Sequence, residues 1–198
     1  MIAILDYGSG NLRSAQRAFA LSGHETLVTS DPTICLESEG LVVPGVGAYG
    51  ACMDQLIAAG GQEIINQRIA MERPLIGICV GMQVLFEGGS EKGGHKGLGI
   101  FNGEVSQIDA PILPHIGWNS VSADTNSTIL RGLDGELFYF VHSYAAKDAV
   151  TDSANSYCNY GENFLAAVER GCVSAVQFHP EKSGAVGAKL IANWVGAL

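Results

Sequence analysis

The sequence predicts an α/β protein in which helices cover both faces of a largely parallel sheet. Short apolar segments alternate with helical segments through the first half of the chain, which is the pattern of strands buried on both faces. After a glycine-rich stretch at 88–99 the chain becomes richer in strand signals, so we expect a mixed sheet. With 198 residues, 47% of them hydrophobic and 16% charged, the composition suits one folded domain over residues 1–198.

The first half alternates strand and helix signals in a regular order. Asn11 is placed to cap a helix whose apolar residues recur on one face. The pair Asp31-Pro32 is typical of the start of a short helix. A longer helical region at 51–71 is expected to break at Gly60-Gly61, and a further helix is expected over 81–88. The predicted strands are the apolar segments 2–5, 25–29, 40–45 and 74–79.

The second half carries strand signals and one helix. A final helix is expected over 183–195, where Val186, Leu190 and Trp194 fall on one face. No linker or repeat divides this half from the first. The predicted strand segments are 100–108, 115–123, 137–144, 164–169 and 172–181.

Charge and cysteine content exclude several classes of function. A net charge of −9 argues against nucleic acid or an anionic membrane as a partner. The apolar runs are too short to span a bilayer, and the first one lacks the basic flank of a signal peptide. The five cysteines form no C-x-x-C pair, so no metal site is expected. We expect reduced thiols in a cytoplasmic protein.

The segment Gly77-Ile78-Cys79-Val80-Gly81 has the G-x-C-x-G pattern of a strand-to-helix turn that presents a nucleophile. Its glycines remove side chains that would clash in so sharp a turn. Such a turn places the thiol at the amino end of a helix, whose dipole favours the thiolate. The N–H of Val80 would then point toward an oxyanion on the substrate. The alternative is that Cys79 is an ordinary core cysteine at the end of a buried strand.

A nucleophilic cysteine needs a base, and the segment AVQFHPE supplies a candidate in His179. Glu181 lies two residues further on, so it projects to the same side of an extended segment and is placed to fix the tautomer of the imidazole. Read alone, the segment favours the alternative of a polar strand end; together with the G-x-C-x-G turn, it favours a catalytic base. His142 is the rival base, although no carboxylate lies close to it in the sequence.

The segment VVPGVGAYG contains a second glycine-rich pattern. Gly45, Gly47 and Gly50 match G-x-G-x-x-G, which nominally indicates a dinucleotide site. Pro44 interrupts the strand-to-helix turn, and no basic residue lies nearby to bind phosphate. We therefore interpret the segment as a loop that supplies a second oxyanion donor, from Gly47 especially.

Together these segments resemble class-I, triad-type glutamine amidotransferases. The motifs that carry the resemblance are PGVG at 44–47, GICVGMQ at 77–83 and FHPE at 178–181. The resemblance narrows to the glutaminase subunits of imidazole glycerol phosphate synthases through DYGSGNL at 6–12, PHIGWNSV at 114–121 and YFVHSY at 139–144. Val80 stands where leucine is usual, but only its backbone N–H is used. The resemblance implies a flavodoxin-like, three-layer α/β/α fold with a mixed, largely parallel sheet.

The resemblance also implies a reaction, in which ammonia is released from glutamine without a cofactor or metal. Cys79 is expected to attack the carboxamide while the N–H groups of Gly47 and Val80 stabilise the tetrahedral intermediate. His179, oriented by Glu181, is expected to protonate the ammonia and then to activate water. By the same resemblance, the residues that hold glutamine are Gln83, Glu91, Ser143 and Tyr144.

Two of the expected substrate-binding residues have open alternatives. Gln83 is equally a solvated helix residue, and Glu91 is equally a loop charge. We also hypothesise that the peptide of Val46 or Gly47 turns before its N–H faces the site, because two glycines make this loop adaptable.

The resemblance implies a partner as well, a separate (β/α)8-barrel cyclase subunit that receives the ammonia. The residues expected to face it are Asn11, Trp118, Asn119, Tyr139 and Lys182, with core packing as the alternative for Trp118. The rival functions are a glutaminase for another synthase, such as the one that makes pyridoxal phosphate, a stand-alone cysteine hydrolase, and a non-catalytic scaffold.

Overall fold

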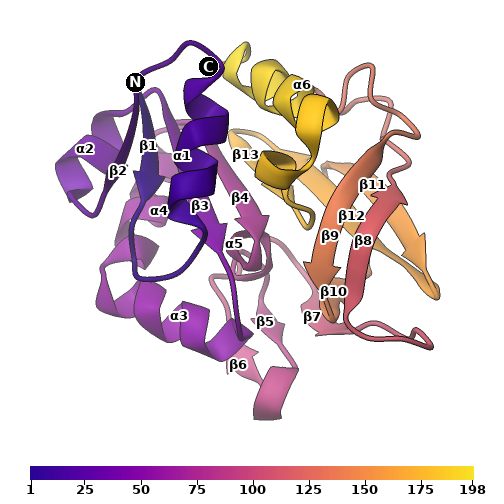
Figure 1. Cartoon of the computed structure of the whole chain (residues 1–198). Helices are drawn as coiled ribbons and strands as arrows, with labels where there is room; N and C mark the ends of the chain where they lie inside the picture. The colour runs from indigo at the N-terminus through magenta and orange to yellow at the C-terminus, as the bar shows by residue number, and fades with distance from the viewer.

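The computed structural model describes all residues from 1 to 198 and is built on a seven-stranded sheet (Figure 1). Its strand order is β11-β12-β13-β4-β3-β1-β2. The five strands from β13 to β2 run parallel, and β12 and β11 extend the sheet in antiparallel fashion. The bounds are β1 Ile2–Leu5, β2 Thr26–Thr29, β3 Gly40–Gly45, β4 Leu75–Cys79, β11 Ala154–Tyr160, β12 Glu162–Arg170 and β13 Val173–Val176.

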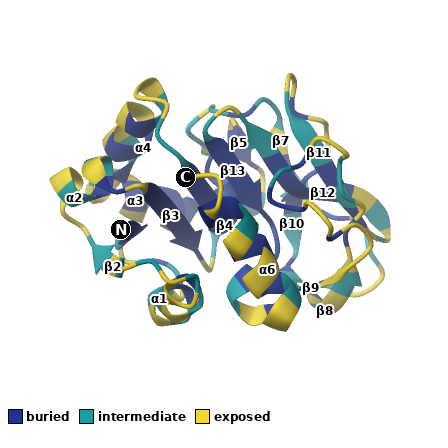
Figure 2. Ribbon diagram, turned by 90° about the horizontal axis from the view of Figure 1, so that it is seen from above, coloured by how far each residue is buried: buried dark blue, intermediate teal, exposed yellow.

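Helices cover both faces of this sheet, as the alternation of apolar and helical segments predicts. Figure 2 shows α1 and α6 on one face and α2, α3 and α4 on the other. The break expected near Gly60 is confirmed, because Gly60 separates α3 from α4 with a φ of +70°. The bounds are α1 Leu12–Ala20, α2 Pro32–Glu37, α3 Tyr49–Ala58, α4 Gly61–Ala70 and α6 Gly184–Val195. No helix is long and apolar enough to cross a membrane.

Two smaller sheets accompany the central sheet: one lies at the carboxyl ends of the parallel strands, and the other lies beside β11 and β12 (Figure 1). One has the order β10-β7-β5-β6 and the other is the β8-β9 ribbon. The bounds are β5 Gly88–Gly89, β6 His95–Lys96, β7 Glu104–Gln107, β8 His115–Ser120, β9 Leu137–His142 and β10 Tyr144–Ala146, with short 3₁₀ turns η1 Glu91–Gly93 and η2 Pro180–Lys182.

The structure corrects the sequence prediction in two places. The helix expected over 81–88 is a single turn, α5 Val80–Gln83, after which the chain enters the short strand β5. Strand β11 was not predicted, because its polar residues, such as Asn155 and Asn159, mask the alternation. It is recognisable as a strand only through its long antiparallel pairing with β12.

A fully buried arginine forms hydrogen bonds with two of the segments that connect helices to strands of the central sheet. Arg68 on α4 is 0% exposed and donates to the carbonyl oxygens of Cys35 (2.7 Å), Ser38 (3.0 Å) and Pro74 (2.6 Å). Burial lowers the pKa of this guanidinium to about 10, so it remains charged at neutral pH. It therefore supplies the donors for carbonyl groups at the end of α2 and before β4.

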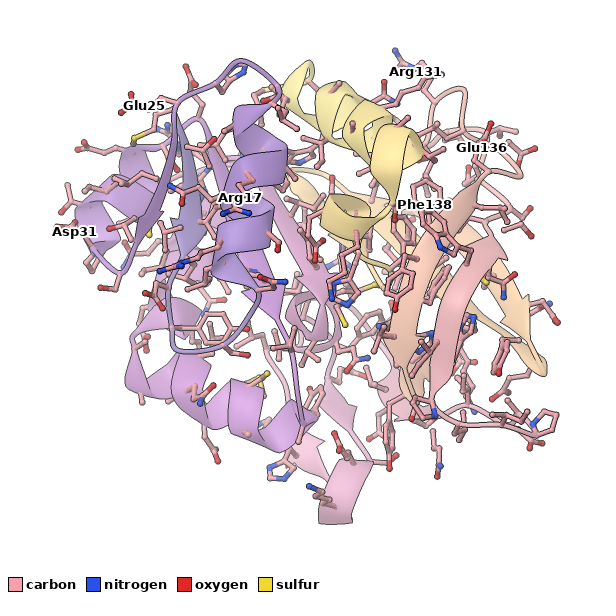
Figure 3. All side chains as sticks on the ribbon, in the orientation of Figure 1. Arg17, Glu25, Asp31, Arg131, Glu136 and Phe138 are labelled. Atoms are coloured by element: carbon pink, nitrogen blue, oxygen red, sulfur yellow. The ribbon has the colours of Figure 1, made fainter.

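We expect Arg68→Met to lower the free energy of unfolding by roughly 3–5 kcal/mol, because several buried carbonyl groups lose their donor at once. Urea unfolding followed by circular dichroism measures this difference. Arg131→Met is the matched control, since Arg131 projects from the surface (Figure 3). Equal stability of the two variants would contradict the role given to Arg68.

Candidate active site

Cys79 stands on a strained turn between β4 and α5. It has φ +57° and ψ −114°, a backbone conformation that residues other than glycine rarely adopt. A Cβ atom at Gly77 would lie 2.6 Å from the carbonyl oxygen of Gly81, and one at Gly81 would lie 1.9 Å from that of Val43 on β3. The two glycines are therefore required by the close approach of backbone segments, and the turn that the G-x-C-x-G pattern predicts is present.

His179 and Glu181 form a buried pair at the end of the neighbouring strand β13. The Nδ1 atom of His179 lies 2.8 Å from Oε1 of Glu181, and the two side chains are 4% and 3% exposed. Since the carboxylate accepts from Nδ1, the Nε2 atom is left for Cys79. Burial by itself lowers the pKa of His179, but Cys79 and Glu181 outweigh burial and raise it to about 10. The ring therefore holds a proton at neutral pH.

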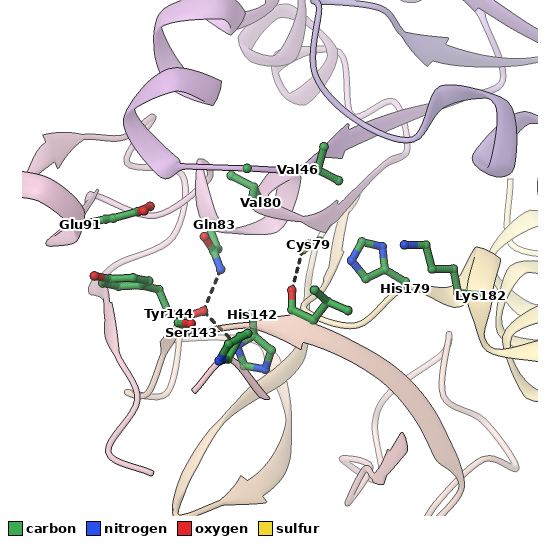
Figure 4. A pocket seen from close by; sticks show the side chains of 13 residues that line it. Val46, Cys79, Val80, Gln83, Glu91, His142, Ser143, Tyr144, His179 and Lys182 are labelled. Carbon is green, nitrogen blue, oxygen red and sulfur yellow. Dashed lines mark hydrogen bonds between the residues drawn. The ribbon is translucent and has the colours of Figure 1, made fainter. Parts of the chain in front are cut away.

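One cavity of about 430 Å³ joins these residues to the expected substrate-binding side chains. Figure 4 shows Cys79 and His179 on one side of it and Gln83, Glu91 and Tyr144 on the other. Of the residues expected at the site or the partner face, five do not line the cavity: Asn11, Trp118, Asn119, Tyr139 and Glu181. Those that line it are Gly47, Cys79, Val80, Gln83, Glu91, Ser143, Tyr144, His179 and Lys182.

Gln83 and Glu91 are both engaged in specific contacts. Gln83 is only 4% exposed, and its Nε2 donates to the carbonyl oxygen of Tyr144 (2.8 Å) and to Oε1 of Gln177 (3.0 Å). The alternative of a solvated helix residue is therefore wrong. Glu91 accepts from the N–H of Tyr49, the first residue of α3, at 2.8 Å. It thus satisfies a helix end that has no cap of its own, a long-range contact that the sequence did not indicate.

The loop after β3 leaves the N–H of Gly47 without an acceptor. Ser9 accepts from the N–H of Val46 (3.2 Å) and donates to its carbonyl oxygen (3.0 Å), which also accepts from the Cys52 thiol (3.1 Å). The N–H of Gly47 belongs to the same planar peptide as that carbonyl and points the opposite way. It has no acceptor within the chain. Cys52 thus helps Ser9 to hold this loop.

This geometry agrees with what comparison with known proteins finds. The family model of glutamine amidotransferase class-I matches residues 3–197. Curated proteins named imidazole glycerol phosphate synthase subunit HisH match the whole chain and 98% of their own length, with 52% identity in Nocardia farcinica, 50% in Thermobifida fusca and 49% in Mycobacterium tuberculosis. The chain belongs to the HisH family of class-I glutamine amidotransferases.

Solved structures support the same fold for this amidotransferase. A crystal structure of a glutamine amidotransferase superposes with a TM-score of 0.79 and 17% identity, over 98% of this chain and 97% of that one. PurLQS from Thermotoga maritima gives a TM-score of 0.75 and 18% identity, over 99% and 97%. The flavodoxin-like, three-layer arrangement expected from the sequence is confirmed.

The rival base of this amidotransferase, His142, has no ring nitrogen free for Cys79. Its Nδ1 lies 3.0 Å from the carbonyl oxygen of Tyr144, and its Nε2 lies 3.0 Å from Nδ1 of His115. Burial lowers the pKa of His142 to about 3 and that of His115 to about 4. Both rings are therefore neutral at pH 7, and the geometry favours His179 as the base. His115, the first residue of the predicted strand 115–123, is 3% exposed.

Three of the residues expected to face a partner lie close together, and one of them, Lys182, lines the cavity. The rings of Trp118 on β8 and Tyr139 on β9 are 6.0 Å apart, and Nζ of Lys182 lies 6.0 Å from the centroid of the Tyr139 ring. Trp118 is 55% exposed, so the alternative of core packing is wrong. The side chain of Asn119, the next residue along β8, points to the inner face of the ribbon, where its Nδ2 donates to the carbonyl oxygen of Asn159 at 2.9 Å.

Proposed function

We propose that this chain is the glutaminase subunit of an imidazole glycerol phosphate synthase in histidine biosynthesis. It hydrolyses glutamine to glutamate and ammonia, and the ammonia passes to a cyclase subunit. The observation that best supports the proposal is the cavity lined by the strained, buried Cys79 and by His179, whose Nδ1 lies 2.8 Å from Oε1 of Glu181. Membership of the HisH family supports the choice of pathway. We assign residues 1–198 to one amidotransferase domain, since one cluster of 52 buried residues runs through them.

In the first half of the reaction, the thiolate of Cys79 attacks the carboxamide carbon and a tetrahedral intermediate forms. The N–H groups of Gly47 and Val80 donate to its oxyanion; the first has no acceptor in the chain, and the second opens α5. The proton of His179 goes to the amide nitrogen, the C–N bond breaks and ammonia leaves. Glu181 stabilises the imidazolium and holds its Nδ1 hydrogen.

In the second half, water hydrolyses the γ-glutamyl thioester. His179, now neutral, takes a proton from water, and the resulting hydroxide attacks the thioester carbonyl. The C–S bond breaks, glutamate leaves, and Cys79 is again a thiolate beside a protonated imidazole. The cycle involves no redox change and no cofactor. The named side chains, glutamine and water account for every bond and proton in it.

The other side of the cavity holds the substrate. Gln83, Glu91, Ser143 and Tyr144 line it opposite Cys79, and they offer amide, carboxylate, hydroxyl and backbone groups to the amino-acid end of glutamine. Glu91 carries the charge that suits the α-ammonium group of the substrate.

The partner is a (β/α)8-barrel cyclase subunit that covers the mouth of the cavity in the cytoplasm. The outer face of the β8-β9 ribbon supports this placement, because Ile116, Trp118 and Leu137 are 59%, 55% and 50% exposed on it. Tyr139 lies on the same face opposite Trp118, Lys182 lies beside its ring, and Asn119 backs the face from the inner side of β8. Asn11 lies near Val46 and His179.

A glutaminase assay with and without the cyclase and its substrate tests the proposal. We expect low glutamate release by the free chain and a marked rise in the complex. The reason is that Ser9 and Cys52 hold the carbonyl oxygen of Val46, and with it the Gly47 N–H of the same peptide, until the loop turns on binding of the cyclase. Glutamate release that is equally high without the cyclase would favour a stand-alone hydrolase. Failure to restore growth of a histidine auxotroph that lacks the glutaminase subunit, when a cognate cyclase is supplied, would favour another synthase.

A further inference from the structure

Two buried histidines lie side by side at the substrate-binding half of the cavity, which His142 lines and His115 does not. His115 and His142 are opposed in the β8-β9 ladder, and Nδ1 of His115 lies 3.0 Å from Nε2 of His142. The ring of His115 is stacked between Tyr160 and Phe140, with centroids 3.9 and 4.9 Å away. Neither ring takes part in the catalytic steps, yet both are almost fully buried polar groups.

The partners of the two rings decide where their hydrogens are. A carbonyl oxygen only accepts, so Nδ1 of His142 carries the hydrogen that it donates to Tyr144. Its Nε2 then holds a lone pair and accepts from the Nδ1–H of His115. Nε2 of His115 accepts in turn from the Nδ2 of Asn119, 3.3 Å away. All three contacts are satisfied when both rings are neutral and carry their hydrogen on Nδ1.

This row of hydrogen bonds ends at the substrate-binding side of the cavity. The carbonyl oxygen of Tyr144 accepts from His142 and also from Nε2 of Gln83, as the dashed lines in Figure 4 show. Since Nε2 of Gln83 also donates to Gln177, its orientation is fixed from two sides. Its Oε1 is thereby left to the cavity that Gln83 lines.

We propose that His115 and Asn119 are positioning residues for glutamine binding: they fix the tautomer and orientation of His142, which holds the Tyr144 carbonyl in place for Gln83. This inference rests on the proposed glutaminase function. His115 acts through His142 and Tyr144, so its loss affects substrate binding. Cys79 and His179 lie outside this row of hydrogen bonds, so loss of His115 leaves the chemical step unaffected.

Two substitutions at His115 separate hydrogen bonding from packing. His115→Phe keeps a ring between Tyr160 and Phe140 but removes both nitrogens. His115→Asn keeps a donor near the position of Nδ1 but removes the ring. In the complex with the cyclase, we expect His115→Phe to raise the KM for glutamine about tenfold, the usual effect of an unsatisfied buried acceptor, with kcat nearly unchanged. We expect His115→Asn to restore most of the lost affinity for glutamine.

A purely structural role predicts the reverse order, with His115→Asn the more damaged variant because it leaves a cavity between two aromatic rings. That order, or a wild-type KM in His115→Phe, would overturn the inference. Ammonia-dependent synthesis by the complex checks that each variant is folded and docked.

Nitrogen-15 NMR of ring-labelled histidine gives a readout that does not depend on activity. We expect both His115 and His142 to be neutral Nδ1–H tautomers at pH 7, and the His142 signals to shift in His115→Phe. A charged ring or an Nε2–H tautomer at either residue would overturn the inference. Lack of glutamine hydrolysis by the wild-type complex would overturn the proposed function instead, and the two failures are thus distinguishable.

Discussion

Cys79→Ala is expected to abolish glutamine-dependent synthesis by the complex and to leave ammonia-dependent synthesis intact. The variant lacks the nucleophile that forms the thioester, so glutamate release falls by roughly 10³-fold or more. Free ammonia needs no glutaminase, and alanine fits the space of the thiol at a site that is 4% exposed. The two activities are measured on the same preparation, as product formation with glutamine or with an ammonium salt.

Cys172→Ala is the matched control for this variant, since Cys172 is a partly exposed thiol outside the cavity. We expect it to retain both activities. A parallel loss of both activities in Cys79→Ala would mean that Cys79 is needed for the fold or for docking, and the assignment of the nucleophile would then be wrong.

The catalytic turn was predictable from the sequence because its determinants are local. The two glycines around Cys79 are needed by backbone atoms of one turn and of the adjacent strand, so the reason for the motif lies within a few residues. The same holds for His179 and Glu181, which are two positions apart. The alternation of strands and helices likewise reflects periodicity within short windows, and it predicted the parallel part of the sheet correctly.

The features that escaped prediction depend on contacts between residues distant in sequence. Glu91 reaches the start of α3, and Arg68 reaches three carbonyl groups of two other segments. The pairing of His115 with His142 requires the register of the β8-β9 ribbon, which no local pattern specifies. The predicted strand 115–123 therefore carried no sign that its first residue, His115, is buried against another histidine.

Glu181→Gln is expected to lower glutamate release by the complex by about 10²–10⁴-fold, because the neutral amide no longer stabilises the imidazolium or fixes its tautomer. The pH dependence identifies the cause. His179 donates a proton while it is charged, and its pKa is raised to about 10, so activity of the wild type persists until the pH rises through that value. Removal of the Glu181 charge lowers this pKa, and we expect the alkaline limb of the kcat profile to move to lower pH.

Glu136→Gln is the matched control, because Glu136 projects into solvent (Figure 3) and leaves the charge near His179 unchanged. The decisive comparison is with His179→Asn. Residues that act as one catalytic unit are not additive, so the double variant with Glu181→Gln is expected to be no slower than His179→Asn alone. A further loss in the double variant, or an alkaline limb that stays in place in Glu181→Gln, would mean that the carboxylate acts separately from the imidazole that it contacts.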